Sequence, residues 1–290
     1  MINKMSKENR RHSSQFRSFS YYKSNIPEYF ANVPLHWHSE FELNYILEGC
    51  GEFICGDERF VSCRGDIIII APNMLHAVYP IEDANYIYDT LVFDKEMLGS
   101  LNNDRSFNEC IRPIISGNCQ INCRITKKHY YYNELRTTAE NIISCAKGDT
   151  AANDLLLKSE LLKLFWLLEE SGDIYPKTES VINRSDVIRP AVEYIKANFK
   201  EDITVDKLAE ISHLSKSYFM SRFKQSAGIG AIEYITHLRI KSACELLTDT
   251  DKTVAEIAFE SGFHNLSNFN RQFKKISGCT PSEFRKKQIR

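Results

Sequence analysis

Two similar stretches near the end of the chain decide the fold of its last hundred residues: Thr204-Val205-Asp206-Lys207-Leu208-Ala209 and Thr253-Val254-Ala255-Glu256-Ile257-Ala258. The first is followed by Phe223-Lys224, Gly228 and Glu233-Tyr234, and the second by Phe273-Lys274, Gly278 and Glu283-Phe284. Each unit predicts a short helix, a tight turn and a second helix. Two such units can place helices in successive segments of a DNA major groove, about 34 Å apart. The helical pattern over 231–247 between them spans about 25 Å and predicts a rigid spacer.

Polar residues mark where the helices of these units begin. Thr204, Ser215 and Thr253 stand at expected N-cap positions. Gly262 stands at the turn of the second unit, where a positive φ is often required. His213 takes the same place in the first unit, so we interpret it as a turn residue and not as a ligand.

Composition indicates a protein with two domains and excludes several classes. The 290 residues are 43% hydrophobic and 26% charged, which suits a globular protein with two cores. No apolar run reaches the length of a membrane span, and the polar N-terminus predicts no export signal, so we expect a cytoplasmic protein. The nine scattered cysteines are then expected to be reduced thiols.

The net charge of −1 is unevenly distributed along the chain. From Asp186 to the end there are 17 Lys and Arg against 13 Asp and Glu, a balance of +4, and residues 1–185 carry −5. A basic C-terminal part is typical of a nucleic-acid-binding domain joined to another domain. We expect a polar arm over 1–24, a domain over 25–171, a linker over 172–185 and a DNA-binding domain over 186–290.

The first domain begins with short β patterns and ends with helices, so the predicted fold class is α+β. Turn residues separate four clear strand patterns: 43–47, 52–55, 60–62 and 67–70. Their close spacing predicts a small barrel or sandwich. Two amphipathic helices are expected over 126–147 and 151–170.

The second of these helices is apolar over more than one face. Two interpretations stay open for its apolar residues, which include Leu161, Leu164, Phe165 and Leu168. They could be buried against the β domain, or they could form the surface of a homodimer, since an exposed apolar face promotes aggregation unless it is covered.

Residues 186–290 resemble the double helix-turn-helix domain of AraC-type transcription regulators. The family pattern is carried by Arg239, Ala243, Leu246-Leu247, Ile257-Ala258, Gly262-Phe263, Phe269, Phe273-Lys274, Gly278, Thr280-Pro281 and Phe284-Arg285. The resemblance implies that outward residues of both recognition helices contact double-stranded DNA. By position these are Ser217, Met220 and Ser221 in the first helix, and Ser267, Asn268 and Arg271 in the second.

The chemistry of these residues suggests different DNA partners. Arg271 suits guanine and Asn268 suits adenine, whereas Met220 and Ser221, where the family often has polar or basic residues, suggest a weaker first helix that acts through thymine methyl groups or DNA shape. Phosphate contacts are expected from lysine and arginine side chains: Lys216, Arg222, Lys224, Lys274 and Lys275.

A second constellation lies in the N-terminal domain, where residues two apart on a strand share one face. His36, His38 and Glu42 have the same parity, and Gly49 and His76 follow. His-x-His-x3-Glu-x6-Gly resembles the first motif of cupin barrels. The second cupin motif is degraded, because only Gly65 and His76 remain and Ala71, Asn73 and Pro80 depart from it. Many AraC-type regulators carry such a barrel to bind an effector.

The resemblance implies a regulator in which His36, His38, Glu42 and His76 bind a small polar effector, with a sugar as the expected class. We expect a homodimer, no cofactor, no bound metal and no catalytic residues. The alternative is a metal-dependent cupin enzyme fused to a DNA-binding domain, because three imidazoles and a carboxylate also suit a divalent metal. Two further interpretations stay open: a barrel that serves only to form dimers, and histidines with a purely structural role.

Overall fold

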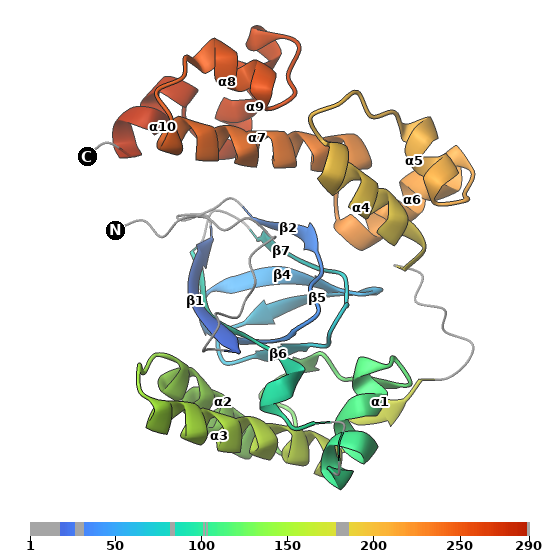
Figure 1. Ribbon diagram of the computed structural model, residues 1–290, viewed down its shortest axis with the longest axis vertical. Coiled ribbons are helices and arrows are strands. Elements are labelled where there is room, and N and C mark those ends of the chain that lie inside the picture. Colours follow the sequence, from blue (N-terminus) through green and yellow to red (C-terminus); the bar gives the residue numbers. More distant parts are fainter. Residues whose placement is uncertain are drawn as a thin grey trace. The chain divides into compact units, whose positions relative to one another are not determined.

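The computed structural model describes residues 18–26, 32–81, 85–100, 102, 104–177 and 186–288. The chain divides into two compact units, a β-rich N-terminal one and a helical C-terminal one (Figure 1). This is the expected α+β organisation. Residues 1–17 of the expected arm and 178–185 of the expected linker lie outside the described residues.

A five-stranded antiparallel sheet forms the larger half of the N-terminal unit. Its order is β1 (Phe19–Ile26), β8 (Tyr86–Phe93), β3 (Phe41–Glu48), β6 (Ile67–Ile70) and β10 (Arg124–Ile125). The four isoleucines of β6 are buried, as expected for a strand covered on both faces. Residues 19–24, which were expected in a polar arm, instead form most of β1 and pair with β8.

The second sheet has four strands, two of which, β4 (Cys50–Cys55) and β5 (Glu58–Cys63), form a tight hairpin. Its order is β2 (Val33–His36), β7 (His76–Pro80), β4 and β5. The strands predicted over 43–47, 52–55, 60–62 and 67–70 lie within β3, β4, β5 and β6, so these predictions are confirmed. A further two-stranded sheet pairs β9 (Cys119–Ile121) with β11 (Ile174–Pro176).

Helices cover one face of the five-stranded sheet. After the short helices η1 (Lys95–Met97), η2 (Phe107–Ile111) and α1 (Arg112–Ile115), the chain forms a helical hairpin of α2 (Tyr132–Ala146) and α3 (Ala151–Glu170). The two helices and the sheet share one core, in which the rings of Phe41 and Phe165 meet edge to face at 5.1 Å. Figure 1 shows this hairpin against the sheet.

The two faces of α3 have different environments. Leu161, Leu164, Phe165 and Leu168 are buried in the core. The interpretation that they are buried against the β domain is therefore confirmed, and their assignment to a dimer surface is wrong, because their side chains already fill the monomer. The exposed apolar residues of the helix are different ones: Leu155, Leu156, Leu162 and Trp166.

Over the described residues 186–288, seven helices build the C-terminal unit, in the order that the repeat predicts. They are α4 (Arg189–Asn198, after the turn η3, Asp186–Ile188), α5 (Val205–Ile211), α6 (Lys216–Ala227), α7 (Ala231–Asp249), α8 (Val254–Glu260), α9 (Leu266–Ser277) and α10 (Pro281–Gln288). Thr204, Ser215 and Thr253 cap α5, α6 and α8 through their hydroxyl oxygens, as expected. Among the helices described, none is long and apolar enough to cross a membrane.

The turns of the two helix-turn-helix motifs confirm the interpretation of His213. Its φ is 54°, and that of Gly262 is 88°, so both adopt the left-handed conformation that the turn needs. The second turn is one residue longer, because four residues separate α5 from α6 and five separate α8 from α9. Asn265, at the end of the longer turn, caps α9.

The cysteines depart from the expectation of reduced thiols at one place. Cys50 and Cys63 form a disulfide across β4 and β5, and the other seven are free. The two residues are direct partners in the antiparallel register, which brings their side chains together. Scattered spacing along the chain gave no indication of this pairing.

Substitutions in the two turns should differ in their effect on stability. Gly262→Ala places a methyl group about 2.7 Å from backbone atoms of Lys200 and strains a positive φ, so it should lower the free energy of unfolding by about 1–3 kcal/mol. His213→Gly relieves a similar strain but adds about 0.5–1 kcal/mol of chain entropy, so it should be nearly neutral. Urea unfolding of both variants measures the difference; equal effects would contradict this account of the turns.

Candidate effector site and DNA interface

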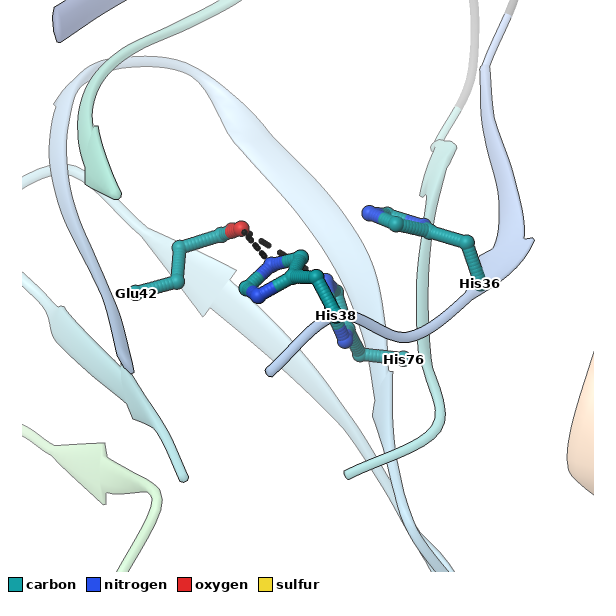
Figure 2. Close-up of side chains that lie close together, drawn as sticks. All are labelled: His36, His38, Glu42 and His76. Atoms are coloured by element: carbon teal, nitrogen blue, oxygen red, sulfur yellow. Dashed lines mark hydrogen bonds and ion pairs between the residues drawn. The ribbon is translucent and has the colours of Figure 1, made fainter. Parts of the chain in front are cut away.

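The four expected effector residues lie together in the structure. His36 ends β2, His38 follows it in the turn before β3, Glu42 is the second residue of β3, and His76 begins β7. One potential ligand atom from each lies within 4.8 Å of the others (Figure 2). Glu42 and His76 are buried, and His36 and His38 are partly exposed.

The reason for this convergence differs from the expected one. His36, His38 and Glu42 do not share one strand face, because the chain leaves β2 after His36 and enters β3 only at Phe41. The turn between the strands brings His38 over Glu42, and β7 supplies His76 from a distant part of the sequence.

Backbone carbonyl groups orient all three imidazoles. The Nδ1 of His36, His38 and His76 donates to the carbonyl oxygens of Pro34, Glu40 and Met74, at 2.9, 3.1 and 2.8 Å. In each ring Nε2 is then the nitrogen that can contact a ligand. The Nε2 atoms of His38 and His76 lie 3.0 and 3.5 Å from one carboxylate oxygen of Glu42.

The other oxygen of Glu42 is held by a chain of two buried polar residues that the sequence analysis missed. The amide nitrogen of Asn44 donates to it at 2.8 Å, and the hydroxyl of Thr90 donates to the amide oxygen of Asn44 at 2.6 Å. Asn44 and Thr90 are direct partners of β3 and β8. The parity of Asn44, two residues after Glu42, was a signal that could have found it.

The charges of the site stabilise one another. Burial lowers the pKa of His38, but the hydrogen bond and the charge of Glu42, aided by Glu40, outweigh it and raise the pKa above its ordinary value. Burial raises the pKa of Glu42, yet the charge of His76 and the hydrogen bond of His38 bring it well below its ordinary value. Below the raised pKa of His38, His38 and Glu42 therefore form an ion pair, in which both nitrogens of His38 donate.

We expect this ion pair to make stability depend on pH. His38 has a raised pKa in the folded state, so its contribution is complete below its ordinary value of 6.5 and is lost as the pH rises through the raised value. The contribution of Glu42 is complete above 4.5 and is lost as the pH falls through the lowered value.

Glu42→Gln should lower the pKa of His38 and remove the loss of stability above its ordinary value. Imidazole titration by NMR and urea unfolding across the same pH range measure the two effects. A His38 pKa that is unchanged in Glu42→Gln would contradict the ion pair.

Three imidazoles and a carboxylate at this spacing permit two kinds of chemistry. They can donate to and accept from the hydroxyl groups of a small polar molecule. They are also a ligand set that suits a divalent cation.

The expected DNA-contacting residues all lie on the outer side of their helices. Ser217, Met220, Ser221 and Lys224 are exposed on α6, and Ser267, Asn268, Arg271 and Lys274 are exposed on α9. The inner side of each helix is aromatic. Phe219 and Phe223 pack with Tyr234, and Phe269 and Phe273 pack in a hydrophobic core that α9 shares with α7 and α8. A guanidinium nitrogen of Arg271 donates to the amide oxygen of Asn268 at 3.1 Å.

The residues expected to contact phosphates differ in their exposure and in their partners within the protein. Lys224, Lys274 and Lys275 are exposed, and Lys216 is paired with Asp206 at 2.8 Å. Arg222 is only 8% exposed, so its assignment to a phosphate is wrong. Its guanidinium lies over the ring of Tyr218 and donates to the side chain of Gln225, because its helix position turns it toward the protein.

Two exposed residues of the recognition helices escaped the sequence analysis. Tyr218 on α6 and Asn270 on α9 are both exposed. The offset of 50 residues that relates Phe223 to Phe273 also relates Tyr218 to Asn268 and Met220 to Asn270. Applying the repeat position by position would have found them.

Arg271→Ala should relax base preference at one position of the DNA site by about 1–3 kcal/mol, because a bidentate contact to a guanine would be lost. Lys274→Ala should weaken all sequences to a similar extent, because a phosphate contact carries no base information. Binding of both variants to a set of single-base operator variants measures the difference. A uniform loss in both would show that Arg271 does not contact a base.

The chain is similar to several known transcription regulators. The chain is 22% identical over 254 residues to the HTH-type transcriptional regulator YdeC of Bacillus subtilis, covering 88% of this chain and 86% of that protein. It is 25% identical over 252 residues to the lactose operon transcription activator of Staphylococcus xylosus, covering 84% and 82%. The solved structure of ToxT from Vibrio cholerae is similar with a TM-score of 0.46 and 15% identity, covering 93% of this chain and 98% of that chain.

Two family models account for the two units of the chain. An AraC-like ligand binding domain matches residues 28–165, and a helix-turn-helix domain matches residues 208–287. These matches contain the histidine and glutamate cluster and both recognition helices, respectively. The chain belongs to the AraC family of DNA-binding transcription regulators that respond to a ligand.

Proposed function

We propose that this regulator responds to a sugar or a sugar derivative bound by His36, His38, Glu42 and His76. The observation that carries the proposal is the buried polar cluster itself. Its charged groups are costly to remove from water unless they are paired, and they present both donors and acceptors at one place. An array of sugar hydroxyl groups can match both kinds of partner.

One relative supports the choice of a sugar. The lactose operon transcription activator of Staphylococcus xylosus is similar to this chain over both units and bears the name of a sugar operon. A sugar also suits the residue types of the site, because imidazoles and a carboxylate can both donate to and accept from hydroxyl groups.

In the proposed arrangement, the β-rich N-terminal unit binds the effector and residues 186–290 bind DNA. The linker expected over 172–185 would be shorter, because Ile174–Pro176 form strand β11. The effector can change regulation only if its affinity differs between two states of the protein.

Recognition of bases rests mainly on Asn268 and Arg271 of α9. Ser217, Met220 and Ser221 of α6 add contacts to methyl groups or to DNA shape, Ser267 adds a polar contact, and Lys224 and Lys274 contact phosphates. The relatives named above are bacterial, so the DNA and this regulator would share the cytoplasm.

Two copies of the chain would pair through the exposed face of α3. Leu155, Leu162 and Trp166 follow one another at intervals of seven and four residues, so they form one stripe along the helix. They are 71%, 46% and 57% exposed. An apolar stripe of this kind is self-complementary across a twofold axis, and a second copy would cover it.

Leu162→Glu combined with Trp166→Glu should abolish the dimer, because the interface would then contain charges without partners. Both positions are exposed in the monomer, so the variant should fold. Sedimentation compares it with the wild type and with Lys128→Glu, an exposed charge change in the turn before α2. A double variant that stays fully dimeric would place the interface elsewhere.

Glu42→Ala should abolish the response to the effector and leave basal DNA binding unchanged. Operator affinity is measured with and without each sugar of a panel, in the wild type, in Glu42→Ala and in Glu48→Ala. Glu48 lies on the same strand but is exposed, so its variant should respond normally. An equal response of wild type and Glu42→Ala would move the effector site away from this cluster.

The same cluster permits one alternative function, a metal-dependent cupin enzyme fused to a DNA-binding domain. Metal analysis of the purified protein and assays of sugar turnover distinguish the two. Stoichiometric metal together with turnover would favour the enzyme. A shift of the melting temperature with a sugar, without turnover, would favour the effector site and would also argue against a barrel that only forms dimers.

A further inference from the structure

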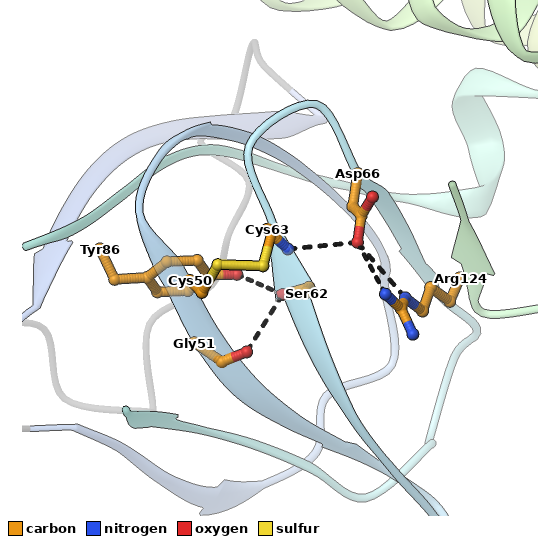
Figure 3. The surroundings of a disulfide bond; sticks show 7 residues. All are labelled: Cys50, Gly51, Ser62, Cys63, Asp66, Tyr86 and Arg124. Atoms are coloured by element: carbon orange, nitrogen blue, oxygen red, sulfur yellow. Dashed lines mark hydrogen bonds and ion pairs between the residues drawn. A yellow bond between two sulfur atoms is a disulfide. The ribbon is translucent and has the colours of Figure 1, made fainter. Parts of the chain in front are cut away.

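The disulfide between Cys50 and Cys63 lies at the edge of the N-terminal unit, and neither the effector site nor the DNA interface uses it. It joins the first residue of β4 to the last residue of β5 (Figure 3). The two residues face each other in the register of the hairpin, so the bond can form and break without a change of pairing.

Access distinguishes this pair from two nearby cysteines of the same unit, Cys55 and Cys123. Cys50 and Cys63 are both partly exposed. Cys55 and Cys123 lie close enough to hydrogen-bond, yet they are only 3% and 4% exposed. That hydrogen bond, together with burial, raises the pKa of Cys55 well above its ordinary value, which suppresses the reactive thiolate. A small reagent therefore reaches Cys50 and Cys63 more readily than Cys55 and Cys123.

The turn that follows Cys63 is a centre of hydrogen bonding. The backbone N–H of Cys63 donates to the carboxylate of Asp66 at 3.2 Å. The N–H groups of Arg64 and Gly65 donate to the carbonyl oxygens of Gly49 and Ile46, at 3.1 and 2.9 Å. The disulfide thus closes a hairpin whose ends are already held by the turn over 63–66.

Two contacts connect this turn to the segment that leads into the helical hairpin. Arg124 of β10 donates through two nitrogens to the carboxylate of Asp66, at 3.1 and 3.3 Å, as Figure 3 shows. The hydroxyl of Tyr132, the first residue of α2, donates to the carbonyl oxygen of Gly65 at 2.9 Å. A change in the position of the turn must therefore alter the hydrogen bonds that β10 and the start of α2 make with it.

The chemical surroundings of a DNA-binding protein favour reduction of such a bond. In the cytoplasm of mesophilic bacteria, low-molecular-weight thiols keep most cysteines reduced, and disulfides are usually transient. A partly exposed disulfide in a DNA-binding regulator is accordingly a candidate for reversible exchange and not for permanent cross-linking.

We propose that Cys50 and Cys63 are a thiol–disulfide exchange site for small thiols, and that the state of their bond sets how firmly the 63–66 turn holds β10 and α2. A small thiolate attacks one sulfur, the Cys50–Cys63 bond breaks, and a mixed disulfide and one cysteine thiolate form. A second small thiol then displaces the remaining cysteine. Two electrons and two protons reach the pair, and the two small thiols leave as their disulfide. The reverse steps oxidise the pair.

Reduction should loosen the end of β5 and the turn, because only hydrogen bonds then hold Cys63 beside Cys50. The start of α2 should exchange its amide hydrogens faster as a result. This consequence concerns the N-terminal unit alone. Its further effect on pairing of two chains through α3 rests on the proposed function.

The test uses the full chain equilibrated with mixtures of reduced and oxidised glutathione. Alkylation and mass spectrometry count the thiols at each position, and hydrogen exchange follows peptides over 119–146. We expect Cys50 and Cys63 to interconvert together, with exchange over 124–135 several-fold faster in the reduced form. Cys50→Ser and Cys63→Ser should each show the fast exchange at every glutathione ratio, whereas Cys110→Ser, at a free cysteine outside the pair, should behave as the wild type.

Two results would overturn the proposal: a pair whose state does not follow the glutathione ratio, or a pair that follows it with no change of exchange over 124–135. Sedimentation and operator binding of both forms are recorded in parallel. A redox response of the peptides without a dimer or without DNA binding would count against the proposed function and leave the exchange site standing.

Discussion

The N-terminal unit is organised around one buried carboxylate. Leaving Glu42 charged and unmatched inside the fold would cost more free energy than a domain has in total stability. The surrounding elements remove this cost. Asn44, itself held by Thr90 of the neighbouring strand, donates to one oxygen, and His38 and His76 face the other. Three different parts of the chain must be in place at once for the charge to be tolerated, which ties the order of the turn before β3 to the register of β3, β7 and β8.

Much of the fold could be predicted from patterns in neighbouring residues, because these patterns depend directly on which side chains are buried and on local backbone geometry. The helix over 151–170, the caps at Thr204 and Thr253, and the left-handed turn at His213 are properties of neighbouring residues, and each was found. The face of α3 that is buried could not be chosen, since both of its faces are apolar and the choice depends on the sheet that it meets.

The candidate site was found by residue type and spacing, and its geometry was not. The motif His36-x-His38-x3-Glu42 identified the cluster, yet a turn and not a shared strand face brings its members together. Asn44, Thr90 and the Cys50–Cys63 pair were missed because they are defined by contacts between strands distant in sequence. Arg222 was misplaced for the related reason that a basic residue on a recognition helix can lie on its inner side.

The two helix-turn-helix motifs differ by one residue in their turns and by most residues on their outer sides. Phe223 and Phe273 keep the cores alike, but Met220 and Ser221 face outward in one motif where Asn270 and Arg271 do so in the other. If the proposed outer residues contact DNA, a single chain should match a stretch of duplex that has no internal symmetry. Such a stretch has a left and a right end, so the bound chain has a polarity along the chromosome, and reversing the site would turn the protein to face the opposite gene.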